Sequence, residues 1–213
     1  MGDIILVRHG QANRHATNEA DYDRLSDLGR QQAQWLGEWM RDHGHGFDHV
    51  LSGTLTRHRQ TVAAMGYEAE EDARLNEIDY YTLSDQLLAV KGEPIPDEDG
   101  FPDHMPKVFA AWSAAEIGGT EPYHAFENRV ATLLKEAAVP GRRLLCITSG
   151  GVIGMVLRHV LDLDMYRMSR VMLPIWNTSI HRLHVRPSET ILAGFNAIPH
   201  LDHPSRAHAR SQV

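Results

Sequence analysis

The chain has 213 residues and a formal net charge of −7, and it is 42% hydrophobic and 23% charged. These values are typical of a soluble globular domain, and the acidic balance argues against a general nucleic-acid binder, which needs a basic face. No run reaches the roughly 18 apolar residues of a membrane span, and the N-terminal apolar run lacks the basic flank of a signal peptide. The single cysteine, Cys146, cannot form a disulfide within the chain, so we expect a buried thiol and a cytoplasmic location.

Strand and helix patterns alternate through the first part of the chain. Residues 4–7 form a short apolar run that is typical of a buried strand. A helix is predicted within residues 25–44, with Ser26 as its N-cap and glycines at its end. Further elements are predicted as a strand over 47–53, a helix over 54–66 and a short strand within 71–78.

The middle of the chain changes in character. Residues 91–106 contain Pro94, Pro96, Pro102 and Pro106 together with many acids, which favours a long loop or a lid. The predicted elements that follow are helices over 104–116 and 123–138, a strand over 142–149, a buried helix over 150–161, and a pair of strands over 178–186 and 189–196. The polar residues 203–213 are expected to be frayed.

This alternation predicts a three-layer α/β/α sandwich with a mostly parallel central sheet. We expect a single domain over residues 1–201, with an inserted lid-like segment at about 80–122 and a polar tail over 202–213. In such sheets ligands bind beyond the carboxyl ends of the strands. This rule brings the ends of the strands at 4–7, 47–53 and 142–149 to one edge.

Two arginines stand at predicted strand ends. Arg8 and His9 directly follow the first strand, and Arg57 lies in the first turn of the helix after the second. A cation there works against the helix dipole, and an anion held between Arg57 and the helix N-terminus would remove the conflict. Guanidinium groups bind phosphate in a bidentate manner, so the pair suggests an anion clamp. Consecutive glycines, Gly150 and Gly151, would let backbone N–H groups approach the same anion.

Other interpretations of these segments are weaker. A hydrolase nucleophile elbow needs glycine where Ile147 stands, and Gly150, Gly151 and Gly154 do not form a dinucleotide-binding fingerprint. Taken alone, Glu77 and Asp79 are ordinary solvated acids. No metal-ligand spacing is evident, and a group of histidines falls in loop-like or tail segments where solvent exposure is expected: His43, His45, His49, His200, His203 and His208.

Seven short motifs occur together in one order: VRHG, LSDLGRQQA, SGTLTRHRQT, LNEID, ITSGG, NTSI and FNAIPHL. In this order the chain resembles the histidine phosphatase superfamily, which has the phosphoglycerate-mutase-like fold, and the resemblance spans residues 4–201. The Arg-His-Gly tripeptide is weak evidence by itself. Its combination with the Arg57 segment and Glu77 makes the resemblance specific.

The resemblance implies a metal-independent phosphomonoesterase that needs no cofactor and acts on a phosphorylated small molecule. His9 would take the phosphoryl group as the nucleophile, while Arg8 and Arg57 hold its oxygens. Glu77 would protonate the leaving oxygen and then activate water. The expected substrate-binding residues also include Gln11, Ser149 and Gly150.

The sequence departs from the family pattern at Ser149, because the family has a second catalytic histidine just before the paired glycines. In one interpretation, Ser149 donates to the phosphoryl oxygens itself or through a water, with reduced catalysis. Alternatively, another histidine reaches the site, and the candidates are His15, His58, His181 and His184. A third possibility is a phospho-ligand binding protein without catalysis. Phosphomutase activity is less expected, because residues 80–110 contain Lys91 and Lys107 as their only lysines or arginines.

Overall fold

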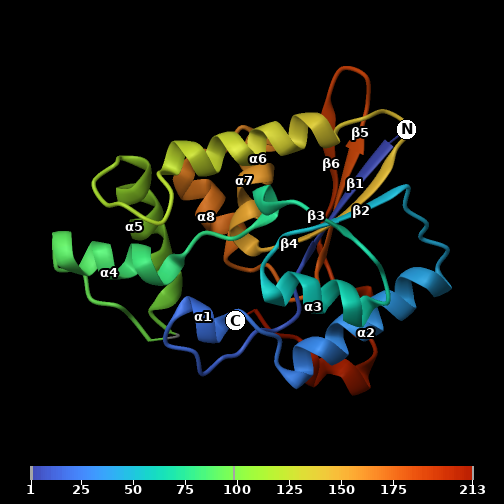
Figure 1. Ribbon diagram of the computed structural model, residues 1–213, viewed down its shortest axis with the longest axis horizontal. Helices are drawn as coiled ribbons and strands as arrows, with labels where there is room; N and C mark the ends of the chain where they lie inside the picture. Colours follow the sequence, from blue (N-terminus) through green and yellow to red (C-terminus); the bar gives the residue numbers. More distant parts are fainter. Residues whose placement is uncertain (1, 98, 213) are drawn as a thin grey trace.

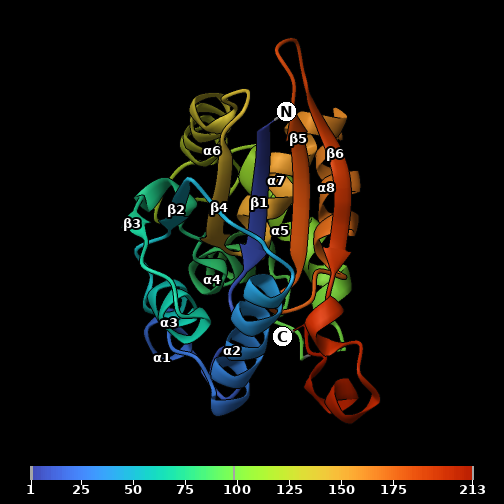
Figure 2. The same ribbon diagram turned by 90° about the vertical axis from the view of Figure 1, so that its right-hand side faces the viewer.

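The computed structural model describes residues 2–97 and 99–212, and its strands form one six-stranded sheet in the order β3-β2-β4-β1-β5-β6. The strands are β1 (Gly2–Arg8), β2 (His49–Ser52), β3 (Glu70–Glu71), β4 (Arg143–Thr148), β5 (Ile180–Val185) and β6 (Thr190–Ala197). Strands β1 to β4 pair in parallel, whereas β5 runs antiparallel to both β1 and β6. Figure 2 shows the strands side by side, and the predicted mostly parallel sheet is confirmed.

Helices cover both faces of this sheet (Figure 1). They are α1 (Glu19–Tyr22), α2 (Asp27–Asp42), α3 (Thr56–Met65), α4 (Tyr80–Lys91), α5 (Phe101–Ser113), α6 (Tyr123–Ala137), α7 (Gly150–Leu161) and α8 (Met165–Met172). Short 3₁₀ segments occur at Ala73–Leu75, Pro199–Leu201 and Pro204–Ala209. Helices α2 and α3 lie on one face and α6 and α7 on the other, while α4 and α5 extend beyond one end of the sheet.

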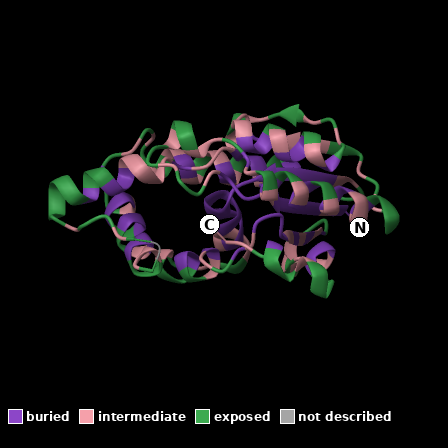
Figure 3. Ribbon diagram, turned by 90° about the horizontal axis from the view of Figure 1, so that it is seen from below, coloured by how far each residue is buried: buried purple, intermediate pink, exposed green. Residues whose placement is uncertain are grey.

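The side chains of β1 alternate between two apolar cores. Ile4 and Leu6 join the large core that includes residues of α5, α6 and α7, whereas Ile5 and Val7 join a smaller core with residues of α2 and α3. Because helices cover both faces, every side chain from Ile4 to Val7 is buried, which explains the uninterrupted apolar run. Figure 3 shows the buried residues concentrated along the sheet and exposed residues on the outer sides of the helices. The predicted three-layer arrangement is confirmed.

Local signals place several elements correctly. The Ser26 hydroxyl accepts a hydrogen bond of 3.0 Å from Gly29 N–H and caps α2, as predicted. The prediction of a strand within 71–78 is wrong for most of that range, because β3 consists only of Glu70–Glu71 and a 3₁₀ turn follows it. Helix α5 begins at Phe101, inside the segment expected to be a loop. Pro102 is tolerated in the first turn of α5, because the N–H that proline lacks would have no hydrogen-bond partner within the helix at that position.

The expectation of a frayed tail is wrong for the described residues up to 212. The completely buried side chain of Gln32 uses its Nε2 to donate to Ala209 O at 2.6 Å and to Ser211 Oγ at 2.9 Å. A buried amide needs such partners, and the tail supplies them.

His200, expected to be exposed, is also buried, and its Nε2 lies 2.8 Å from the hydroxyl oxygen of Thr178.

Two expectations drawn from composition can be compared with the fold. Cys146 is buried in β4, and this burial raises the pKa of its thiol to about 12, so a buried unreactive thiol is confirmed. Among the described residues, the helices are all too short or too polar to cross a membrane.

Candidate active site

A cavity of about 900 Å³ lies at the carboxyl ends of the central strands. Because β1 and β4 are parallel neighbours with Arg8 opposite Thr148, the residues that follow them meet at this edge. The cavity is lined by five of the residues predicted from the sequence, namely Arg8, His9, Arg57, Glu77 and Gly150. Segments that are far apart in the chain therefore converge as expected.

His9 is held as a neutral imidazole with one nitrogen committed. The side chain is buried, and its Nδ1 lies 2.7 Å from the carbonyl oxygen of Gly10. A carbonyl can only accept, so Nδ1 carries the proton and Nε2 keeps its lone pair. Burial lowers the pKa of His9 well below its usual value, and the positive charges of Arg57 and Arg8 lower it further. The Nε2 atom is therefore available as a nucleophile near neutral pH.

The two arginines carry donors with no partner among the described residues. Arg57 is completely buried, and its Nη1 pairs with Glu19 Oε1 at 2.6 Å and with Asp23 Oδ1 at 3.1 Å. Its Nε and Nη2 atoms are unpaired, as is the Nε of Arg8, whose Nη1 donates to Ile175 O. Buried unpaired donors cost about 1–3 kcal/mol each, and more when charged. An anion bound between these guanidinium groups would satisfy them.

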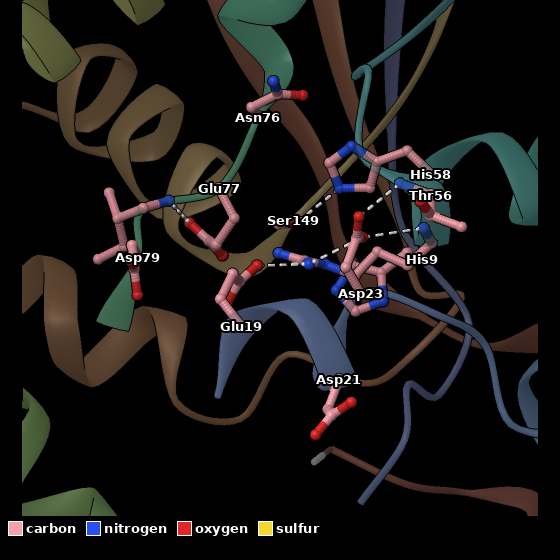
Figure 4. A network of polar contacts seen from close by, with 12 residues as sticks. His9, Glu19, Asp21, Asp23, Thr56, His58, Asn76, Glu77, Asp79 and Ser149 are labelled. Atoms are coloured by element: carbon pink, nitrogen blue, oxygen red, sulfur yellow. Dashed lines mark hydrogen bonds and ion pairs between the residues drawn. The ribbon is translucent and has the colours of Figure 1, made fainter. Parts of the chain in front are cut away.

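The anion at the N-terminus of α3 comes from the chain itself. The Asp23 carboxylate accepts hydrogen bonds from Thr56 N–H at 2.8 Å and from Arg57 N–H at 3.1 Å (Figure 4). The expected ligand position between Arg57 and this helix end is thus already filled by Asp23. Glu19 is a second site residue that the sequence analysis missed. Burial raises the pKa of Glu19 and the charge of Arg57 opposes that shift. The cluster of acids within residues 19–23 was the available signal.

Glu77 faces the cavity from the segment before α4. Its Oε2 accepts a hydrogen bond of 2.8 Å from Gly151 N–H, and its Oε1 accepts one of 3.0 Å from Ile78 N–H. Asp79, two residues later, instead caps α4: its Oδ1 accepts from Thr82 N–H at 3.0 Å. Of these two acids, Glu77 alone lines the cavity.

Ser149 and Gln11 are not among the residues that line the cavity. Ser149 is completely buried, and its Oγ lies 2.6 Å from Nε2 of His58. The Gln11 side chain is turned to the start of α2, where its Oε1 accepts from Ser26 Oγ at 2.9 Å. Substrate binding by Gln11 stays a prediction.

Among the four histidines considered as replacements for the family's second one, His58 is the histidine that reaches Ser149. The ring centroids of His58 and His9 are 5.7 Å apart. His181 and His184 are bonded elsewhere, to Ser179 and Asp3, and His15 is exposed.

Comparisons with known proteins find related sequences and similar folds. A 2,3-bisphosphoglycerate-dependent phosphoglycerate mutase of Allorhizobium ampelinum is 36% identical over 94 residues, which cover 39% of this chain and 44% of the mutase, less than half of its length. The Bacillus stearothermophilus protein YhfR superposes with a TM-score of 0.69 at 19% identity, covering 94% of this chain and 99% of YhfR.

An Entamoeba histolytica phosphoserine phosphatase carrying an H9A mutation superposes with a TM-score of 0.63 at 20% identity, covering 94% of this chain and all of that one. The model of the histidine phosphatase superfamily (branch 1) matches residues 4–198. Because the family model matches nearly the whole chain, the protein belongs to the histidine phosphatase superfamily, branch 1.

Proposed function

We propose that the protein is a metal-independent phosphomonoesterase that works through a phosphohistidine on His9. The observation that carries this proposal is the pairing of a neutral His9, whose Nδ1 is tied to Gly10, with unpaired guanidinium donors of Arg8 and Arg57 beside it. Such a site offers a nucleophile and a charge complement for a phosphoryl group. Membership in a phosphatase superfamily supports the same conclusion.

The reaction takes two steps. Nε2 of His9 attacks the phosphorus, the bond from phosphorus to the ester oxygen breaks, and protonated Glu77 gives its proton to the departing alcohol. The Glu77 carboxylate then takes a proton from water while the water oxygen attacks the phosphohistidine. The bond between phosphorus and Nε2 breaks, inorganic phosphate leaves and Glu77 is again protonated. Throughout, Arg8 and Arg57 hold the phosphoryl oxygens.

Two alternative functions receive less support. A mutase acting on a phosphorylated carboxylic acid needs cations for a second anionic group, and beyond Arg8 and Arg57 the described lining of the cavity offers Arg170 as its further cation. A binding protein needs the arginine clamp alone. A binding protein gains nothing from a carboxylate that lines the same cavity as an imidazole with a free Nε2, and this arrangement favours the enzyme.

The test is turnover of 4-nitrophenyl phosphate in the presence of EDTA. We expect the wild type to release nitrophenol and His9→Ala to be inactive, whereas His49→Ala, a change at an exposed histidine of β2, retains activity. Quenching without acid after mixing with ³²P-labelled substrate should trap label on His9. Activity that survives His9→Ala contradicts the mechanism. Phosphate binding without turnover on a broad panel of phosphomonoesters would favour the binding protein.

A further inference from the structure

The Ser149 hydroxyl occupies an unusual position for a residue at a helix start. Ser149 is the N-cap of α7, a position where serine normally uses its side chain to accept from the backbone of the first turn. Here the hydroxyl makes no such bond and lies 2.6 Å from His58 Nε2 instead. Figure 4 shows the His58 ring directed at Ser149, on the same side of the site as His9.

The two ring nitrogens of His58 decide the direction of this hydrogen bond. Nδ1 is buried and has no partner among the described residues. A proton on Nδ1 would be a buried unpaired donor, which is more costly than a bare lone pair. Burial and the charge of Arg57 lower the pKa of His58, so the ring carries one proton, and that proton belongs on Nε2. His58 therefore donates to the Ser149 oxygen.

This direction leaves the hydroxyl hydrogen of Ser149 free. A serine oxygen that accepts from His58 still has its own O–H to donate. Among the described residues, no other hydrogen-bond partner of that hydroxyl is found. The residues on either side of Ser149 fix where it lies: Thr148 O accepts from His9 N–H at 2.9 Å, and Gly150 lines the cavity. Ser149 therefore lies just behind the cavity wall, and its partner His58 has its ring centroid 5.7 Å from that of His9.

A glycine makes room for this arrangement. A Cβ atom at position 53 would lie 2.1 Å from His58 Nδ1, so any larger residue there would push the ring away from Ser149. Gly53 directly follows β2. The carboxyl end of β2 lies at the same edge of the sheet as the carboxyl ends of β1 and β4. The ring of His58 is thus seated by the fold, and both members of the pair are completely buried.

We infer that His58 and Ser149 act as one unit, in which the His58 Nε2–H orients the Ser149 hydroxyl so that its O–H donates to an oxygen of the phosphoryl group on His9. Ser149 is the group that contacts the substrate, and His58 is a positioning residue. The two side chains together supply the hydrogen-bond donor that a histidine at position 149 would supply by itself. This inference rests on the proposed phosphatase function and adds two residues to its machinery.

The first experiment compares His58→Leu with His58→Gln, measuring kcat and KM for 4-nitrophenyl phosphate. The two side chains are similar in size, but only glutamine can donate to Ser149. We expect kcat to fall about 10²-fold in His58→Leu and in Ser149→Ala, with a smaller change in KM, and to recover in large part in His58→Gln. The double variant His58→Leu/Ser149→Ala should lose no more than either single variant, because the residues act together. Additive losses, or equal kcat in His58→Leu and His58→Gln, overturn the inference.

The second experiment moves the imidazole from position 58 to position 149. Ser149→His alone should lose activity, because the new imidazole meets the ring of His58. His58→Ala/Ser149→His frees that volume and places the donor on one residue, so it should regain most of the wild-type kcat. A double variant no better than Ser149→His overturns the inference. Circular dichroism and thermal melting of each variant separate this outcome from misfolding.

Vanadate binding separates the failure of the inference from the failure of the proposed function. Vanadate affinity can be measured by thermal shift whether or not the wild type turns over substrate. If the wild type is inactive, the proposed function fails, and the pair is still supported when Ser149→Ala and His58→Leu weaken vanadate binding equally and not additively. Unchanged vanadate affinity in Ser149→Ala overturns the inference under either outcome for turnover.

Discussion

The carboxylate of Glu77 rests on the backbone of Gly151, whose N–H donates to Oε2 at 2.8 Å. The contact is possible because residue 151 has no side chain: a Cβ atom there would lie 2.2 Å from Oε1 of the same carboxylate. The position of the proposed general acid is therefore set by a glycine in another element. A change at Gly151 should act on catalysis through Glu77 without touching the phosphate clamp.

We expect Gly151→Ala to slow an alkyl phosphate by about 10²-fold or more and 4-nitrophenyl phosphate by less than about tenfold, because a good leaving group needs little protonation. Glu77→Gln should show the same selectivity. Steady-state kcat/KM for both substrates provides the measurement. Gly154→Ala is the matched control in the same helix, since its Cβ would face Met172. Equal losses on both substrates would assign Glu77 a structural role.

Phosphate should stabilise the folded protein through Arg57. A ligand at 100 times its Kd raises the free energy of unfolding by about 2.7 kcal/mol when it binds the folded state alone. We expect inorganic phosphate to raise the melting temperature of the wild type and of Arg59→Ala, an exposed neighbour paired with Glu71. Arg57→Ala should abolish the rise, because it removes the unpaired Nε and Nη2 donors. A rise that persists in Arg57→Ala places the anion elsewhere.

Much of the cavity lining is apolar, with Ile78, Phe101, Met105, Phe109 and Leu173 among its residues. Burying one methylene group contributes about 0.8 kcal/mol, which corresponds to about a fourfold change in an equilibrium constant. We expect kcat/KM to rise along the series of alkyl phosphates from butyl to octyl phosphate, by up to about fourfold for each added methylene group. The alcohols released from these substrates have the same basicity, so the chemical step does not change along the series. Met105→Glu should flatten the series. A wild-type series without slope would mean that the alcohol does not contact this apolar lining.

Acid should destabilise the fold through His181. Its Nδ1 accepts from Asn196 N–H at 3.3 Å and its Nε2 lies 2.9 Å from Ser179 Oγ, so the folded state holds the ring neutral. Burial, together with Arg8, lowers the pKa of His181 from 6.5 to about 3. Between these values the unfolded state binds one more proton, so the free energy of unfolding decreases as pH falls below 6.5, by about 1.4 kcal/mol per pH unit.

Urea denaturation between pH 7.5 and 4.5 tests this dependence. His181→Gln keeps hydrogen-bonding capacity but has no titrating group. Below pH 6.5, its free energy of unfolding should therefore fall by about 1.4 kcal/mol less per pH unit than that of the wild type. The buried His200, whose pKa is also lowered to about 3, should leave a remaining slope in that variant. Identical slopes for wild type and His181→Gln would contradict the prediction.

Sequence patterns predicted those parts of the fold whose signals are local. The apolar run before Arg8 and the cap at Ser26 were readable because each depends on neighbouring residues. Helix α4 was missed although Asp79 caps it and Leu83 and Leu87, one turn apart, are buried. The cap signal at Asp79 was present, but in the sequence it was interpreted as a solvated acid.

The site was predictable to the extent that its residues follow strand ends. Parallel neighbours bring Arg8, His9 and the residues after β4 together in any such sheet, so these could be expected from order alone. The partners of Arg57 and Ser149 could not be. Asp23 lies 34 positions before Arg57 and His58 lies 91 positions before Ser149, and nothing in either local pattern says which polar groups will meet.

The buried amide of Gln32 has a consequence for the order in which the molecule assembles. Its Oε1 accepts from Gln11 N–H at 2.9 Å, close to His9 in the chain, while its Nε2 donates to Ala209 O, 177 residues further along. As the chain leaves the ribosome, β1 and α2 are made long before β4 and β5, the two neighbours of β1 in the sheet. The Gln32 amide that holds the backbone of Gln11 is therefore fully bonded only after residues 209–211 have been made, later than the residues of the surrounding core.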